Sequence, residues 1–329
     1  MKVLSSVLLF YALLFLTPSI SRSEVVIAVI GKTKNDSFYE QSFNGCLKFS
    51  QKHADLKCLY DGPFDYQDIR GQNIVVKDMI KSRVDGVLIS TTDSNFLAKD
   101  ALMLAKKSNI PVVTFDSDLL PEHRDYRLAY VGTNNFDFGA ALGKYATKFK
   151  KKRITEICIQ TGHRTTPNLN KRVAGVRFAL SGNRRNQKLS GVNGWKESDR
   201  CPFYTMGHRT TALGQLEFVL AQELPPVFLA VAGFAQFSQD YIKKISPYKE
   251  QIISREIIII SADTEEIQLE ALGKNLSTIN IGQRPFEMGR LGAELLYDYI
   301  NNNNLPKQEF YFLDYHYCTS SNTDTCTIN

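Results

Sequence analysis

Two aspartates follow apolar stretches that have the length and composition of buried strands. Asp116 ends the run from 111 to 115, and Asp263 ends the run from 256 to 262. Ligands of open α/β sheets bind outside the carboxyl ends of the strands, so carboxylates in these places can accept hydrogen bonds from a polar ligand. Asp263 could instead cap the helix predicted over 265–272. We interpret Asp116 as a ligand-binding residue and Asp263 as a second candidate.

Four further side chains lie near predicted strand ends. Ser90 follows the apolar run that begins at Val84, where it is either a turn residue or a ligand contact. Arg172 lies in the first turn of a helix predicted over 169–180. It is either solvated or a ligand contact, and Arg177, on the far side of that helix, suits a solvated role better. Phe38 and Tyr39 open a helix predicted over 38–53. Adjacent residues cannot both face one core, so one ring either lies at the surface or stacks on a ligand.

The sequence lacks the patterns that would indicate an enzyme. It has no Gly-x-Ser-x-Gly elbow, no phosphate-binding loop and no zinc signature. No Cys-x-x-Cys occurs and no two histidines stand four apart. Two aspartates could serve as acid and base, but nothing requires it. We predict a binding protein without metal, cofactor or catalytic residues.

The composition allows two α/β domains with substantial cores. The chain has 329 residues, of which 43% are hydrophobic. Without Lys2 and Arg22, which lie in the predicted leader, 38 basic residues face 34 acidic ones, a mild net charge of +4. The one basic run, 148–153, is interpreted as a solvated helix end. No basic stripe with interleaved aromatics occurs, which argues against nucleic acid as a partner.

Residues 1–23 are typical of a secretory signal peptide. Lys2 precedes an apolar run from Val3 to Leu16, and small residues at Ser21 and Ser23 suit cleavage after Ser23. No later apolar run reaches the ~18 residues of a membrane span. We predict an exported chain that is not inserted in a membrane.

Six cysteines suit an oxidising compartment. Six cysteines allow 15 connectivities, but their places favour local pairs. Cys46 lies on the first predicted helix and Cys58 on the next strand, Cys158 and Cys201 fall in neighbouring strands, and Cys318 and Cys326 flank a polar tail. The predicted disulfides are therefore 46–58, 158–201 and 318–326.

Strand and helix patterns alternate along the whole chain in two series. The first series runs to a short strand at 128–131 and includes one helix over 95–108; the second starts at the strand 154–160 and includes a strand within 195–206. This alternation predicts an α/β fold of two doubly wound, Rossmann-like parallel-sheet lobes. We expect crossings between the lobes at 132–134 and 283–285. The first lobe would comprise 24–133 with 284–312, and the second 134–283 with the cysteine-bearing tail 313–329.

The order of these motifs resembles the type I periplasmic binding proteins, most closely the ribose-, pentose- and hexose-binding group that shares its fold with LacI-type effector domains. The likeness covers 25–313 and rests on a series of short motifs. Asn35-Asp-Ser-Phe-Tyr39 resembles the loop that ends in two aromatics, and Asn109 to Asp116 resembles the strand "NIPVVTxD". The motifs at 84–94, 171–175, 261–263 and 281–283 resemble further parts of the family's binding site.

The resemblance implies a two-lobed protein joined by a multi-strand hinge, with a sugar between the lobes. Its polar ligands would be Asp116, Arg172, Asp263 and Gln283, and Phe38 and Tyr39 would stack on the sugar. Ser117 replaces an arginine often found there, and Gly233-Phe234 replaces an expected asparagine, so Phe234 could supply a second aromatic wall.

The resemblance also implies a role. We predict a monomeric solute-binding protein that presents a small polar ligand, with a cationic amine as a fallback, to an ABC permease. The alternative is a sensing subunit acting on a membrane histidine kinase. A LacI-type repressor is disfavoured by the leader and by the absence of an N-terminal helix-turn-helix.

Overall fold

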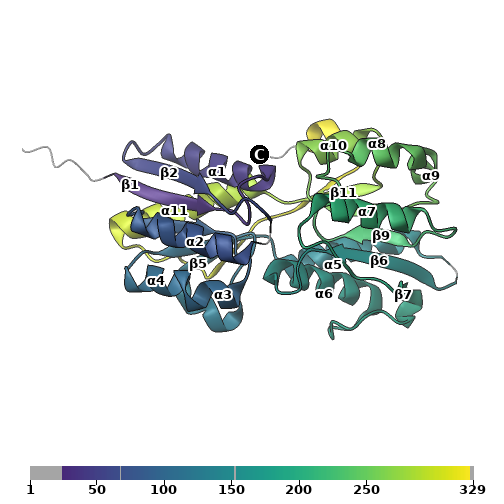
Figure 1. Cartoon of the computed structure of the whole chain (residues 1–329), viewed down its shortest axis with the longest axis horizontal. Helices are drawn as coiled ribbons and strands as arrows, with labels where there is room; N and C mark the ends of the chain where they lie inside the picture. The colour runs from purple at the N-terminus through teal and green to yellow at the C-terminus, as the bar shows by residue number, and fades with distance from the viewer. Residues whose placement is uncertain (1–23, 67, 152, 327–329) are drawn as a thin grey trace, which may run out of the picture.

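The computed structural model describes residues 24–66, 68–151 and 153–326. The predicted signal peptide and its cleavage site lie outside these residues. The elements form two lobes, which lie side by side in Figure 1 with helices on both faces of each sheet. Within the described ranges, no helix is both long enough and apolar enough to span a membrane.

The first lobe is built on a six-stranded parallel sheet with the order β12-β5-β4-β3-β1-β2. Its strands are β1 (Val25–Ile30), β2 (Leu56–Asp61), β3 (Gly86–Ile89), β4 (Val112–Phe115), β5 (Ala129–Gly132) and β12 (Phe310–Phe312). Its helices are α1 (Ser37–Ser50), α2 (Ile69–Lys81), α3 (Ser94–Lys99), α4 (Ala101–Lys107) and α11 (Pro285–Asn302). β3, β4 and β5 are buried throughout, as expected of strands covered on both faces.

The second lobe repeats this plan with the order β13-β11-β10-β9-β6-β7, and β8 also pairs with β6. Its strands are β6 (Thr155–Thr161), β7 (Trp195–Glu197), β8 (Phe203–Tyr204), β9 (Val227–Ala230), β10 (Ile259–Ala262), β11 (Ile279–Gly282) and β13 (His316–Cys318). Its helices are α5 (Asn135–Ala146), α6 (Pro167–Ser181), α7 (Arg209–Leu220), α8 (Tyr241–Ile245), α9 (Lys249–Ile253) and α10 (Glu266–Gly273). Only β13 runs antiparallel to its neighbour among the described pairs.

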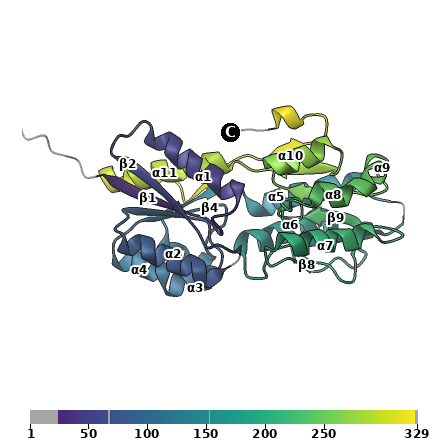
Figure 2. The same cartoon turned by 45° about the horizontal axis from the view of Figure 1, so that its top comes forward.

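Three segments pass from one sheet to the other, and Figure 2 shows them between the lobes. The first links β5 to α5 after Gly132, and the second links β11 to α11 after Gly282. The third links β12 to β13 through 313–315. A hinge of three segments therefore joins the two lobes.

Some local expectations were wrong. The helix expected over 95–108 is two helices, α3 and α4, because Asp100 leaves helical geometry at φ −135°. Its carboxylate accepts hydrogen bonds from Asn73 and Lys77 of α2. The strand expected within 195–206 is two short strands, β7 and β8, and neither α9 nor β13 was foreseen.

The structure forms the three disulfides that the sequence predicts. They join Cys46 to Cys58, Cys158 to Cys201, and Cys318 to Cys326. The first ties α1 to β2. The last closes the tail, whose two sulfurs pack with Leu269 and Leu272 of α10. The tail is therefore fastened to the second lobe.

Candidate functional site

The two aspartates occupy equivalent places in the two lobes. Asp116 follows β4 with φ 54°, and Asp263 follows β10 with φ 71°. The backbone N–H of each donates to the next strand of its sheet, to Val131 and Ile281 respectively. This left-handed turn is unfavourable for most side chains, though less so for aspartate. It directs each carboxylate away from its strand and into the space between the lobes.

Asp116 is bound by side chains from both lobes. In the first lobe, Ser90 Oγ donates to its Oδ2 over 2.8 Å and Lys32 Nζ lies 3.1 Å from the same oxygen. In the second lobe, Asn168 Nδ2 donates to Oδ1 over 3.0 Å and Arg172 Nη2 lies 3.4 Å away. Burial alone would raise the pKa of Asp116, but the two cations outweigh it and hold this pKa below its ordinary value. Asp116 is therefore a buried anion.

Arg172 connects several groups around the cleft. It donates from Nε to Asn135 over 2.7 Å, from Nη1 to the carbonyl of Val231 over 3.0 Å, and from Nη2 to Gln283 over 2.9 Å. Its helix, α6, can lie this near because Gly139 of α5 sits against the backbone of Arg172, where a Cβ would clash. The guanidinium is only 2% exposed. These acceptors hold its planar donors in place.

Gln283 carries this network to the second aspartate. Its Nε2 donates to Asp263 Oδ1 over 2.9 Å. Asp263 Oδ2 also accepts from the backbone N–H of Gly233 over 3.3 Å. Burial raises the pKa of Asp263, with Arg172 offsetting part of the effect. A continuous chain of contacts therefore joins Asp116 of one lobe to Asp263 of the other.

Aromatic side chains from both lobes surround the polar groups. The hydroxyls of Tyr39 and Tyr66 lie 3.2 Å apart. The Tyr66 ring meets the Phe234 ring edge to face across the cleft, at 5.0 Å between centroids. Phe38 and Phe237 complete the aromatic part of the lining. Phe38 and Tyr39 are both buried, so the alternative that placed one of the two rings at the surface is wrong.

The lobes enclose a small cavity at this point. It measures about 20 Å³, close to the ≈10–15 Å³ that one water needs. Seven of the eight residues singled out from the sequence line it; Ser90 does not and lies behind Asp116. The predicted residues in the lining are Phe38, Tyr39, Asp116, Arg172, Phe234, Asp263 and Gln283.

Three members of the cluster were missed by sequence reasoning. Lys32 is 1% exposed and donates to Asn168 Oδ1 across the cleft over 3.0 Å. Burial lowers the pKa of Lys32, although Asp116 counteracts it. Asn168 is the second residue of α6 and Tyr66 lies in the loop after β2, both in polar segments. The only signal for these residues is that their segments follow the carboxyl ends of strands.

Two other sequence interpretations are corrected by the structure. Arg177 was considered a solvated arginine, but it is buried and makes a bidentate pair with Glu197, at 2.7 and 2.9 Å. Asp263 does not cap the following helix, because Glu265 holds that position in a capping box with Gln268.

A second opening lies beside the first, on the hinge side. This cavity of about 300 Å³ shares Phe38, Asp263 and Gln283 with the cleft. Gln41 of the first lobe donates to Glu265 of the second across it, over 2.6 Å. Burial raises the pKa of Glu265 to about 8, and the nearby carboxylates of Asp36 and Asp263 act in the same direction.

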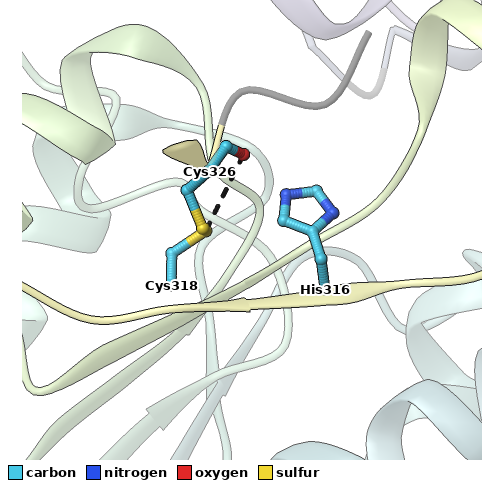
Figure 3. A group of neighbouring side chains, drawn as sticks. All are labelled: His316, Cys318 and Cys326. Atoms are coloured by element: carbon cyan, nitrogen blue, oxygen red, sulfur yellow. Dashed lines mark hydrogen bonds between the residues drawn. A yellow bond between two sulfur atoms is a disulfide. The ribbon is translucent and has the colours of Figure 1, made fainter. Parts of the chain in front are cut away.

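The tail contains the one group of metal-ligand side chains that stands close together in the described residues. His316, Cys318 and Cys326 offer ligand atoms within 4.8 Å of one another. Figure 3 shows the three side chains together. The two sulfurs are joined as a disulfide, so neither is a thiolate. His316 instead contacts Thr264 Oγ1 at 3.0 Å. As a disulfide, the group does not supply the ligands of a zinc site.

Two lobes with a polar cluster between their strand ends define a two-lobed binding-protein architecture. The sequence matches the family model described as a periplasmic binding protein domain over residues 27–304. The chain therefore belongs to this family of periplasmic binding proteins.

Solved structures share the fold at low sequence identity. An ABC transporter solute-binding protein from Burkholderia graminis in complex with D-arabinose is 22% identical, with a TM-score of 0.77, over 92% of this chain and 98% of its own. One from Agrobacterium vitis with bound D-fucose is 21% identical, with a TM-score of 0.77, over 91% and 97%. Another from Agrobacterium vitis, bound with alpha-D-tagatopyranose, is 17% identical, with a TM-score of 0.77, over 92% and 96%. Among curated proteins, none matches the sequence significantly.

Proposed function

We propose that this protein is an exported solute-binding protein that closes around a neutral, polyhydroxylated small molecule, a monosaccharide or a close analogue. The observation that carries this proposal is the chain of contacts from Asp116 through Arg172 and Gln283 to Asp263. A ligand that replaces the contact between Asp116 and Arg172, the one member of this chain that crosses between the lobes, holds the lobes together. Binding and closure are then the same event.

The chemistry of the cluster suits sugar hydroxyls. A hydroxyl donates one hydrogen bond and accepts others, so it can bond at once to a carboxylate and to a guanidinium or ammonium group. Asp116 and Asp263 supply acceptors, and Arg172 and Lys32 supply donors. Aromatic rings provide apolar walls for the C–H faces of a sugar ring, and Tyr66 and Phe234 lie on opposite sides of the cleft.

The balance of buried charge favours a neutral ligand. Two cations, Lys32 and Arg172, face two carboxylates, Asp116 and Asp263. An amine or an acid would add an unpaired charge to a closed site, which is costly. Lys32 in particular argues against the cationic amine that the sequence left open as a fallback.

The relatives support a transport role. Structures that share the fold are ABC transporter proteins with bound D-arabinose, D-fucose and tagatose. We therefore propose a periplasmic, monomeric protein that presents its ligand to an ABC permease and performs no catalysis. Nothing in the described residues favours the alternative of a kinase-sensing subunit. We also retain the division into lobes at 133–134, 283–284 and 312–313.

Ligand entry requires the lobes to separate. The cleft cavity of about 20 Å³ is far smaller than the roughly 300 Å³ at which small-molecule pockets begin. The three crossing segments near Gly132, Gly282 and 313–315 are the places where backbone rotation would open the cleft.

Thermal unfolding with a ligand panel tests the proposal. The panel should contain pentoses, hexoses, sugar alcohols, furanoses, amino acids and polyamines. A ligand at about 100 times its Kd adds ~2.7 kcal/mol to the free energy of unfolding. We expect a rise in Tm of several degrees with one class of sugar. Asp116→Ala should abolish this rise, whereas a shift with amines or amino acids alone would reject a neutral sugar as the ligand.

A further inference from the structure

A basic groove lies at the end of the second lobe that is farthest from the first lobe. It measures about 600 Å³ and is lined by residues before β6, β9 and β10. The nearby helix α9 marks this end at the right of Figures 1 and 2. We call it the basic pole. Its charged lining residues are Lys148, Lys150, Lys151, Arg153, Arg255, Glu156 and Glu256.

The basic pole is strongly positive for a protein of mild overall charge. Five cations and two carboxylates line it, which gives a local charge of +3. All five cations belong to exposed residues. Glu156 is engaged by other partners, Lys196 at 3.3 Å and Ser198 at 3.0 Å. Lys148 lies over the Tyr145 ring at 4.1 Å, and Arg255 donates to the carbonyl of Ile252. Among the described ion pairs, none joins one of these five cations to a carboxylate, so their charges can attract an external anion.

Apolar side chains are exposed among these cations. Ile154 is 52% exposed and Leu224 is 62% exposed, and both line the groove. Ile253 of α9, two residues before Arg255, is 46% exposed. Exposed aliphatic side chains set among basic ones are typical of surfaces that contact an anionic lipid interface.

The pole is separate from the ligand site. It lies at the amino ends of β9 and β10, whereas Phe234 and Asp263 lie beyond their carboxyl ends. A strand rises ~3.3 Å per residue, so the four residues of β10 alone place roughly 13 Å between the two sites. A partner bound at the basic pole therefore leaves the cleft between the lobes accessible.

From these observations we propose that the basic pole binds the anionic headgroups of a phospholipid membrane, with Ile154 and Leu224 in contact with the interface. Each basic residue near such a surface strengthens binding roughly fivefold, and salt weakens the attraction. The proposal does not depend on the identity of the ligand in the cleft.

Co-sedimentation of the ligand-free protein with vesicles tests the proposal. One set of vesicles contains phosphatidylglycerol and phosphatidylcholine in equal parts, and the other contains phosphatidylcholine alone. The test variant is Lys150→Gln/Lys151→Gln/Arg153→Gln. The control, Lys48→Gln/Lys52→Gln/Lys57→Gln, removes the same charge from exposed positions in the first lobe.

We expect the wild type to bind only the anionic vesicles, and to be released when salt is raised from about 0.1 M to about 1 M. The pole variant should bind on the order of 100-fold more weakly, and the control within about twofold of wild type. Circular dichroism should show both variants folded. Equal losses in the two variants, no preference for anionic vesicles, or binding of soluble polyglutamate but not vesicles would each overturn the proposal.

Discussion

Replacing Asp116 by asparagine should destabilise the protein, because it removes the carboxylate that Lys32 and Arg172 both contact. These two cations are 1% and 2% exposed, so water cannot solvate them when the carboxylate is lost. Removing one partner of a buried ion pair typically costs 3–5 kcal/mol. The asparagine oxygen can still accept from Ser90, which places the expected loss near the lower end, at about 3 kcal/mol. For a protein of this size that lowers Tm by roughly 6–12 °C.

Thermal unfolding followed by circular dichroism measures this effect. A pH series tests its origin, because a carboxyl with a depressed pKa contributes stability above its ordinary value near 3.8 that is lost as the pH falls below it. The difference in thermal stability between wild type and Asp116→Asn should therefore be largest at neutral pH and become smaller below about pH 4. The double variant with Lys32→Met should recover part of the loss, by ~1–3 kcal/mol. A single variant that melts within about 2 °C of wild type would refute the reasoning.

Two further predictions concern other parts of the fold. Burial raises the pKa of Glu265 from its ordinary value of 4.5 to about 8, so between these two pH values the folded protein holds a proton that the unfolded chain releases. The stability that this group contributes is full below about pH 4.5 and is lost as the pH rises toward 8. In the Glu265→Gln variant, the free energy of unfolding should therefore not show this decrease. Denaturant unfolding at pH 5 and at pH 8 measures the difference for both proteins. A variant as sensitive to alkaline pH as wild type would contradict the assignment. Among the disulfides, Cys158–Cys201 spans 43 residues and Cys318–Cys326 spans 8. Loop entropy predicts a stabilisation of about 4 kcal/mol from the first disulfide and about 2.5 kcal/mol from the second. Replacing Cys158 and Cys201 by alanines should therefore lower the urea midpoint more than replacing Cys318 and Cys326. A larger effect of the second pair would exclude loop entropy as the main cause.

The fold could be predicted from the sequence because its signals are local. Short apolar runs such as the one ending at Phe115 alternate with amphipathic helices, and this pattern by itself indicates parallel sheets. The break at Asp100 escaped prediction because it depends on partners in α2, Asn73 and Lys77, rather than on a proline or glycine.

The site could be predicted only in part. Asp116 and Asp263 were found because each directly follows a recognisable strand. Lys32 was missed because a lysine in a polar loop resembles a solvated one, and its burial depends on Asn168, 136 residues later. Arg177 was misjudged for a similar reason: the face of α6 that seemed free is covered by Glu197 at the end of β7. Contacts between distant segments decide both cases.

The most direct test of the account is a calorimetric titration with the sugar that gives the largest thermal shift. It should compare wild type with one variant from each lobe, Asp116→Asn and Asp263→Asn, and with Asp240→Asn, which alters an exposed carboxylate outside the cleft. Hydrogen bonds to charged groups contribute ~1.5–3 kcal/mol, so each cleft variant should bind about 10- to 150-fold more weakly, while the control binds like wild type. If both cleft variants are folded and bind with wild-type affinity, the ligand does not lie between these aspartates and the account is wrong.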